Sequence, residues 1–337
     1  MAGLAPAAGP LAHDCRALSA VLAEAARKCD AAASSLDQAA IVGGAYARRN
    51  AGGGDAGGAV PPVSLDHAAA TARGTPAQDP PIDHAQLGSY YIPLGASHRS
   101  AEDIATSVAV QGTTGDCGLV AACNALRRHS PHQAARVVRP VQGGSSVRLY
   151  RRGPMGDLVA DDIVVGNALP RNGAASAFRD GAGNFGSPEA SWISYVEKSF
   201  AVARGNSYEN LVEIEAEDVL EGLTGQEYVT TTASAAEIAE SMRRGAVVAG
   251  TRTKKAIEWE FRPSGARRPV SADQVANTQP GHWYSVYAVT SEHDQRGNEV
   301  LTVVLENPWG SSDPLTQYLK LNELDFRRLF DAVVMRA

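Results

Sequence analysis

The amino-acid sequence predicts an α+β fold in which a helix-rich lobe precedes a strand-rich lobe and a helical extension precedes both. Three observations support this prediction. Apolar residues recur at helical spacing in residues 11–41 and in several stretches between residues 101 and 244. From residue 246 onward, short β-rich segments alternate with turn residues. Glycine, alanine and proline dominate residues 50–62, a composition that is typical of flexible linkers.

The predicted extension is one long helix over residues 11–41. Small and apolar residues repeat there every seven positions, in one stripe that contains Cys15, Leu22, Cys29 and Leu36 and a companion stripe that contains Leu11, Leu18, Ala25, Ala32 and Ala39. Such a pattern is typical of an amphipathic helix on the protein's own surface. It would also suit docking to a partner or self-association with a second copy of the chain.

Four segments follow from these patterns: a helical extension at 1–49, a Gly/Pro/Ala-rich linker at 50–87, a helix-rich lobe at 88–232 and a β-rich lobe at 233–337. In the helix-rich lobe, helical spacing predicts helices at 102–106, 117–129, 192–203 and 216–223. Apolar and β-branched residues on either side of a glycine-proline turn predict strands at 147–150 and 158–165.

The β-rich lobe is predicted to begin with a helix at 234–244, where Ser234 and Glu237 fit a capping box and Gly245 ends the helix. Apolar segments separated by turn residues then predict strands at 246–252, 256–262, 282–290, 300–306 and 317–321.

Composition argues against several classes of protein. A net charge of −6, without a basic patch interleaved with aromatic residues, argues against nucleic-acid binding. No apolar stretch approaches the ~20 residues of a membrane span. Residues 1–10 lack the basic start of a secretory signal peptide, so we expect a cytoplasmic protein or one exported without a cleaved signal. Four cysteines without metal-ligand spacing fit free thiols in a reducing compartment, and the richness in alanine and glycine suggests a bacterial source.

The segment Gln111-Gly-Thr-Thr-Gly-Asp-Cys117 carries the strongest candidate for chemistry, because a glycine-rich approach ends on a cysteine and a helical apolar run follows it. Unpaired N–H groups and the helix dipole favour a thiolate at such a position, and a thiolate is the nucleophile of thiol enzymes. The amide of Gln111 would pair with the Cys117 main-chain N–H to hold an oxyanion. A lone cysteine before a helix is more often a small buried residue, so this assignment depends on partners elsewhere.

Two later segments supply those partners, Gly281-His282-Trp-Tyr-Ser-Val and Glu306-Asn307-Pro-Trp-Gly. The strands predicted on either side of the turn-rich residues 291–298 form an antiparallel hairpin, and centring it on that turn pairs His282 with Asn307. A carboxamide that accepts from one imidazole N–H fixes the tautomer of the ring and leaves the other nitrogen free to face a thiol.

These motifs together resemble the catalytic domain of the calpain family of cysteine proteases, over residues 101–336. The similar segments, in chain order, are Gln111–Cys117, Val159–Asp162 with Leu169-Pro170, Trp192–Lys198, Ser207–Leu211, Leu223–Gly225, Gly281–Val286, Asn307–Gly310 and Leu324–Phe326 with Phe330. The resemblance implies a papain-like fold of two lobes with the active cleft between them. Its implied site residues are Cys117 as nucleophile, His282 as general base and then acid, Asn307 as the orienting residue and Gln111 as oxyanion donor.

The implied function is that of an intracellular or effector-type endopeptidase of narrow specificity, acting on protein or peptide substrates. The same triad would also support an acyltransferase or a deamidase, and a non-catalytic scaffold pseudoprotease is a third alternative. Gly118 stands where the family usually has tryptophan, which we expect to open the floor of the cleft.

We expect neither calcium nor another cofactor. Calcium-gated members of the family carry acidic residues in loops of each lobe. Here Val108-Ala-Val110 precedes Gln111, and only Asp313 is acidic in the stretch after Asn307-Pro-Trp-Gly.

Overall fold

A computed structural model describes residues 79–81, 91–93, 100–170, 172–177, 191–253, 278–293, 297–310 and 317–337. The extension predicted at 1–49, nearly all of the predicted linker and the strand predicted at 256–262 lie outside these ranges. Helices and strands are mixed in the described residues, which is consistent with an α+β fold. No helix in that part of the chain is both long and apolar enough to cross a lipid bilayer.

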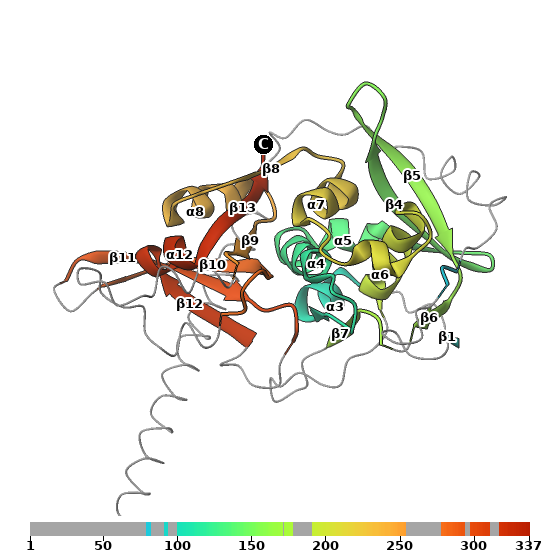
Figure 1. Ribbon diagram of the computed structural model, residues 1–337, viewed down its shortest axis with the longest axis horizontal. Helices are drawn as coiled ribbons and strands as arrows, with labels where there is room; N and C mark the ends of the chain where they lie inside the picture. Colours follow the sequence, from blue (N-terminus) through green and yellow to red (C-terminus); the bar gives the residue numbers. More distant parts are fainter. Residues whose placement is uncertain are drawn as a thin grey trace, which may run out of the picture. The chain divides into compact units, whose positions relative to one another are not determined.

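Helices dominate residues 91–224, which we call the helical part (Figure 1). Its helices are α3 (Ala101–Thr106), α4 (Cys117–His129), α5 (Pro131–Val137), α6 (Trp192–Ala203) and α7 (Ala216–Thr224), with a 3-10 turn, η1 (Tyr208–Leu211). Its strands form three small antiparallel sheets: β1 (Tyr91–Pro93) with β6 (Ala168–Pro170), β2 (Val108–Val110) with β7 (Ala175–Ala177), and β3 (Val138–Val141), β4 (Gly144–Arg152) and β5 (Leu158–Val165). The four predicted helices and the strand at 158–165 are confirmed, most of them at the expected residues.

One six-stranded antiparallel sheet dominates residues 228–337, which we call the sheet part (Figure 1). Its strand order is β12-β11-β10-β9-β13-β8. The strands are β8 (Tyr228–Thr231), β9 (Val248–Thr251), β10 (Trp283–His293), β11 (Glu299–Glu306), β12 (Tyr318–Asn322) and β13 (Phe330–Arg336), and the helices are α8 (Ala235–Arg244) and α12 (Glu323–Leu329). The capping box predicted at Ser234 is present.

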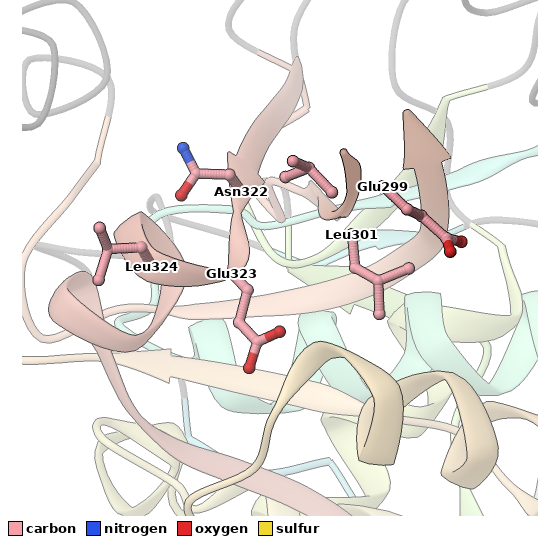
Figure 2. Close-up of a pocket in the computed structure, with 6 residues that line it drawn as sticks. Glu299, Leu301, Asn322, Glu323 and Leu324 are labelled. Atoms are coloured by element: carbon pink, nitrogen blue, oxygen red, sulfur yellow. The ribbon is translucent and has the colours of Figure 1, made fainter. Parts of the chain in front are cut away.

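The predicted hairpin exists, but its predicted register is wrong, by two positions next to the site and by three next to the turn. Ser285 pairs with Glu306 and His293 pairs with Glu299, because β10 runs further than expected before the turn. His282 and Asn307 therefore lie just beyond the ends of their strands instead of pairing within the ladder. At the opposite end of the hairpin, Glu299, Leu301 and Glu323 help to line a surface pocket (Figure 2). Five residues of β11, Thr302–Glu306, separate that pocket from Asn307, a distance of roughly 20 Å along the strand.

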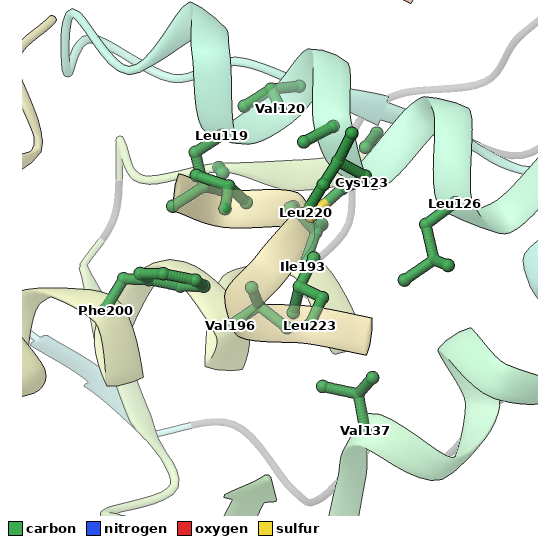
Figure 3. Packing of buried hydrophobic residues seen from close by; sticks show 14 of the residues in the cluster. Leu119, Val120, Cys123, Leu126, Val137, Ile193, Val196, Phe200, Leu220 and Leu223 are labelled. Carbon is green, nitrogen blue, oxygen red and sulfur yellow. The ribbon is translucent and has the colours of Figure 1, made fainter. Parts of the chain in front are cut away.

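Helix α4 is the centre of the packed core in the helical part. Leu119, Cys123 and Leu126 on α4 are almost fully buried. They belong to one cluster with Ile193 of α6 and Leu220 of α7 (Figure 3). Because Cys117 is the first residue of this helix, the core fixes the position of its main chain.

Candidate active site

Cys117 is half-buried at the first turn of α4, directly after the N-cap residue Asp116. Burial raises the pKa of its thiol, and the charge of Asp116 acts in the same direction. Main-chain N–H groups, first that of Trp283, act in the opposite direction but do not outweigh burial. The sequence-based expectation of a favoured thiolate therefore does not hold, since loss of solvation outweighs the helix N-terminus.

His282 and Asn307 are brought together as the sequence predicts. The Nε2 atom of His282 lies 3.2 Å from Oδ1 of Asn307, and both side chains are buried. The same Oδ1 atom accepts a hydrogen bond from the main-chain N–H of Trp309 at 3.0 Å. Burial lowers the pKa of His282 to about 4, and the hydrogen bond to Asn307 offsets only part of this effect.

Aromatic rings surround the imidazole of His282. The ring of Trp309 lies 4.9 Å from it between centroids, and the ring of Tyr284 meets it edge-on at 5.0 Å. Trp309 is 49% exposed, whereas His282 is only 5% exposed. The indole of Trp309 therefore lies between the imidazole and solvent. The main chain of His282 is also fixed, because its N–H donates to Oγ1 of Thr251 at 2.8 Å.

The first residues of β10 lie next to Cys117. The main-chain N–H of Trp283, the residue after His282, lies beside the Cys117 sulfur, and the pKa of Tyr284 is raised first by burial and then by the charge of Cys117. Within the described residues, no hydrogen bond joins the Cys117 sulfur to the His282 ring. The raised pKa of Cys117 and the lowered pKa of His282 both favour the neutral forms.

Gln111 lies on the same loop as Cys117 and also contacts the sheet part. Its main-chain N–H donates to the carbonyl oxygen of Pro308 at 2.8 Å, and its Nε2 donates to the carbonyl oxygen of Thr114 at 2.6 Å. One amide hydrogen of Gln111 is thus used within the loop. The main-chain bond places Gln111 next to the segment that follows Asn307.

Gly118 does not open the cleft floor as expected. A Cβ atom at this position would lie 2.0 Å from the carbonyl oxygen of Ile214. Main chain, not empty space, therefore occupies the volume that a side chain would need.

Sequence reasoning missed a pair of buried acids beneath the nucleophile loop. Asp116 and Glu197 are both fully buried, and their carboxyl groups interact. Burial raises the pKa of Asp116 to about 7 and that of Glu197 well above its ordinary value. In the described part of the chain no donor reaches either oxygen of Asp116 at hydrogen-bond distance, although the side chains of Glu197 and Gln111 are close enough to lower its pKa in part. A proton on the acid pair therefore stabilises the two carboxyls. The available signal was the charged pair Glu197-Lys198 within α6, whose other residues are mostly apolar.

Comparison with known proteins identifies a protein family. A profile of the family described as "Calpain family cysteine protease" matches residues 96–318, about two thirds of the chain. Among curated proteins, no relative matches this sequence.

Solved structures give weaker similarities. They include the SERA5 proenzyme of Plasmodium falciparum at 12% identity and a TM-score of 0.24, with 44% of this chain and 47% of that chain covered. They also include PepW of Lactobacillus rhamnosis HN001 at 13% identity and a TM-score of 0.21, with 48% and 42% covered. The alignments thus span less than half the length of each of these two solved chains. The family profile, in contrast, covers all four predicted site residues, and the chain belongs to the calpain family of cysteine proteases.

Proposed function

We propose that this chain is a cysteine endopeptidase of narrow specificity, with a papain-like arrangement of two lobes and a Cys117-His282-Asn307 triad. The observation that carries the proposal is the contact of 3.2 Å between the buried His282 ring and Asn307. Trp283, the residue after His282, begins β10, and its main-chain N–H lies beside the Cys117 sulfur. A carboxamide that holds an imidazole in one orientation is the arrangement that a thiol nucleophile requires.

In the proposed reaction, His282 takes the thiol proton on the ring nitrogen that does not face Asn307. The Cys117 sulfur then forms a bond to the peptide carbonyl carbon, and the charge that develops on oxygen is stabilised by the Cys117 main-chain N–H and the second amide hydrogen of Gln111. His282 returns the proton to the leaving amine as the C–N bond breaks. Water, activated by the same imidazole, hydrolyses the acyl-enzyme. Because burial keeps both groups neutral, proton transfer accompanies sulfur attack.

The decisive experiment compares wild type with Cys117→Ala on an array of protein substrates, with mass spectrometry as the readout. We expect new peptide termini with wild type, none with Cys117→Ala, and loss of labelling by a thiol-directed epoxide in the variant. Hydrolysed side-chain amides without new termini would instead indicate a deamidase, and transfer of the acyl group to an amine would indicate an acyltransferase. Identical behaviour of the two proteins would contradict catalysis altogether.

One observation favours a non-catalytic scaffold as the second candidate, namely the thiol and imidazole that are neutral and not hydrogen-bonded to each other. A scaffold would bind its partner equally well with Cys117→Ala and would show no turnover before the substitution.

We further propose that activity does not depend on calcium. The main support is the apolar segment Val108–Val110, which forms strand β2 immediately before Gln111 and offers no carboxylate. Activity should be unchanged by a calcium chelator. Self-association through residues 11–41 stays a prediction, which the size of the protein in solution with and without residues 1–49 would test.

A further inference from the structure

A buried cluster of charged side chains joins α4 to the end of β11. Glu306, the last residue of β11, is fully buried. Its two carboxylate oxygens lie 2.9 and 2.8 Å from Nη2 of Arg127 and 3.3 and 3.4 Å from Nη2 of Arg128. Two hydroxyl groups also donate to it, from Tyr318 at 3.2 Å and from Ser285 at 3.3 Å. Every oxygen of this carboxylate is therefore satisfied.

Glu306 is held in its ionised form. Burial alone would raise its pKa, but the charges of Arg127 and Arg128 outweigh burial and lower it. Arg128 is further held by the ring of Tyr287, whose centroid lies 3.5 Å from its guanidinium carbon. Removal of the carboxylate would leave two guanidinium groups at a buried junction without their counter-ion, and unpaired buried charge is strongly unfavourable.

The network continues from Arg127 to the strand that leads into Gln111. Nε of Arg127 donates to Oδ1 of Asn124 at 2.7 Å. Asn124 in turn bonds both main-chain groups of Ala109 in β2, each at 2.8 Å. One continuous set of buried hydrogen bonds thus links β2, α4 and β11.

The cluster lies at one end of a rigid helix whose other end carries the nucleophile. Cys117 is the first residue of α4, and Arg127 lies ten residues, roughly 15 Å, further along its axis. Glu306 directly precedes Asn307, whose Oδ1 faces His282. Near the nucleophile, the bond from Gln111 to Pro308 ties the two parts a second time. Two attachment points fix how α4 lies against the hairpin that carries the other two site residues.

We propose that Glu306, held by its ion pairs with Arg127 and Arg128, is a positioning residue that sets Asn307 and His282 opposite Cys117. This inference rests on the proposed function, because the geometry that the cluster fixes is that of the triad. A misplacement of about 1 Å between reacting groups can cost about 100-fold in rate. The effect of losing Glu306 should therefore fall on kcat more than on KM.

The test uses Glu306→Gln, which keeps the shape of the side chain but removes its charge. Asp162→Asn is the matched control: Asp162 accepts from Nε and Nη2 of Arg148 at 2.9 and 2.8 Å, but both residues belong to the hairpin β4-β5 of the helical part. On a peptide that wild type cleaves, we expect Glu306→Gln to lower kcat about 10- to 100-fold and to change the pH profile of kcat/KM. We expect the control to match wild type in both measurements.

A second variant separates positioning from folding. Glu306→Gln combined with Arg127→Met removes most of the unpaired buried charge, so it should recover thermal stability. The double variant still lacks the ion pairs between Glu306 and the two arginines, so its kcat should stay low. Recovery of wild-type kcat in this double variant would overturn the inference, as would a folded Glu306→Gln protein with unchanged kcat and pH profile.

Hydrogen exchange keeps the outcome separate from that of the proposed function. The Gln111 amide bonds Pro308 across the junction, so its protection should fall in Glu306→Gln and not in Asp162→Asn. If wild type cleaves no substrate, the proposed function fails, yet this loss of protection would still support the positioning role. Equal protection in wild type and Glu306→Gln would overturn it.

Discussion

Burial of His282 should make the native state lose stability as the pH falls. Burial lowers its pKa from an ordinary value of 6.5 to about 4. In the unfolded chain the ordinary value returns, so between these two pH values the unfolded state binds a proton that the native state does not. Each tenfold change in an equilibrium constant is worth roughly 1.4 kcal/mol, so the contribution of His282 to the free energy of unfolding should fall by about 3 kcal/mol across this interval.

Urea unfolding of wild type and His282→Gln, from about pH 8 to about pH 4, measures this contribution. Glutamine can still bond Asn307 but does not titrate. The control is His293→Gln, since His293 is exposed at the other end of β10. The stability difference between wild type and His282→Gln should change by about 3 kcal/mol over the pH range, in favour of the variant at acid pH. The difference for His293→Gln should stay constant. A constant difference for His282→Gln as well would refute the burial argument.

Three further changes test other contacts. Glu197→Gln should reduce the stability that wild type loses as the pH rises above about 4, because the native acid pair retains protons that the unfolded chain releases; urea unfolding from about pH 4 to about pH 8 measures this, and equal losses would contradict it. Gly118→Ala should destabilise the fold by about 1–3 kcal/mol, since the new Cβ meets the Ile214 carbonyl oxygen; an unchanged Tm would contradict that close approach. Leu126→Ala should cost about 2–5 kcal/mol in the core around α4, and a loss below about 1 kcal/mol in urea unfolding would show that this core adapts.

The sequence predicted the structure best where residues close together in the chain determine an element. The helix at 192–203 has apolar spacing along its length and turn residues on both sides, and it forms where predicted. Ser234 and Glu237 form the predicted capping box, because this contact involves only residues of the first helical turn. Strand β13 was not predicted, because its place in the sheet depends on pairing with β9 and β8, far away in the chain.

In the site, the partners of the nucleophile could be predicted but their ionisation could not. A hairpin brings His282 to Asn307 even with a register error, because both residues flank one turn. The pKa of Cys117 depends on how deeply α4 is buried, which no local motif specifies. Glu306 presented a similar difficulty. A charged residue at the end of an apolar strand gave a signal, but its partner Arg127 lies 179 residues away.

Burial acts on His282 and Asp116 with opposite consequences for pH dependence. The lowered pKa of His282 means that the native state gains stability as the pH rises from about 4 to 6.5. The raised pKa of Asp116 means that the native state loses stability as the pH rises from its ordinary value of 3.8 to about 7. The two contributions overlap and oppose each other, and the raised pKa of Glu197 adds to the loss. The pH profile of wild-type stability therefore shows only the sum of these contributions, and the single substitutions at His282 and Glu197 separate them.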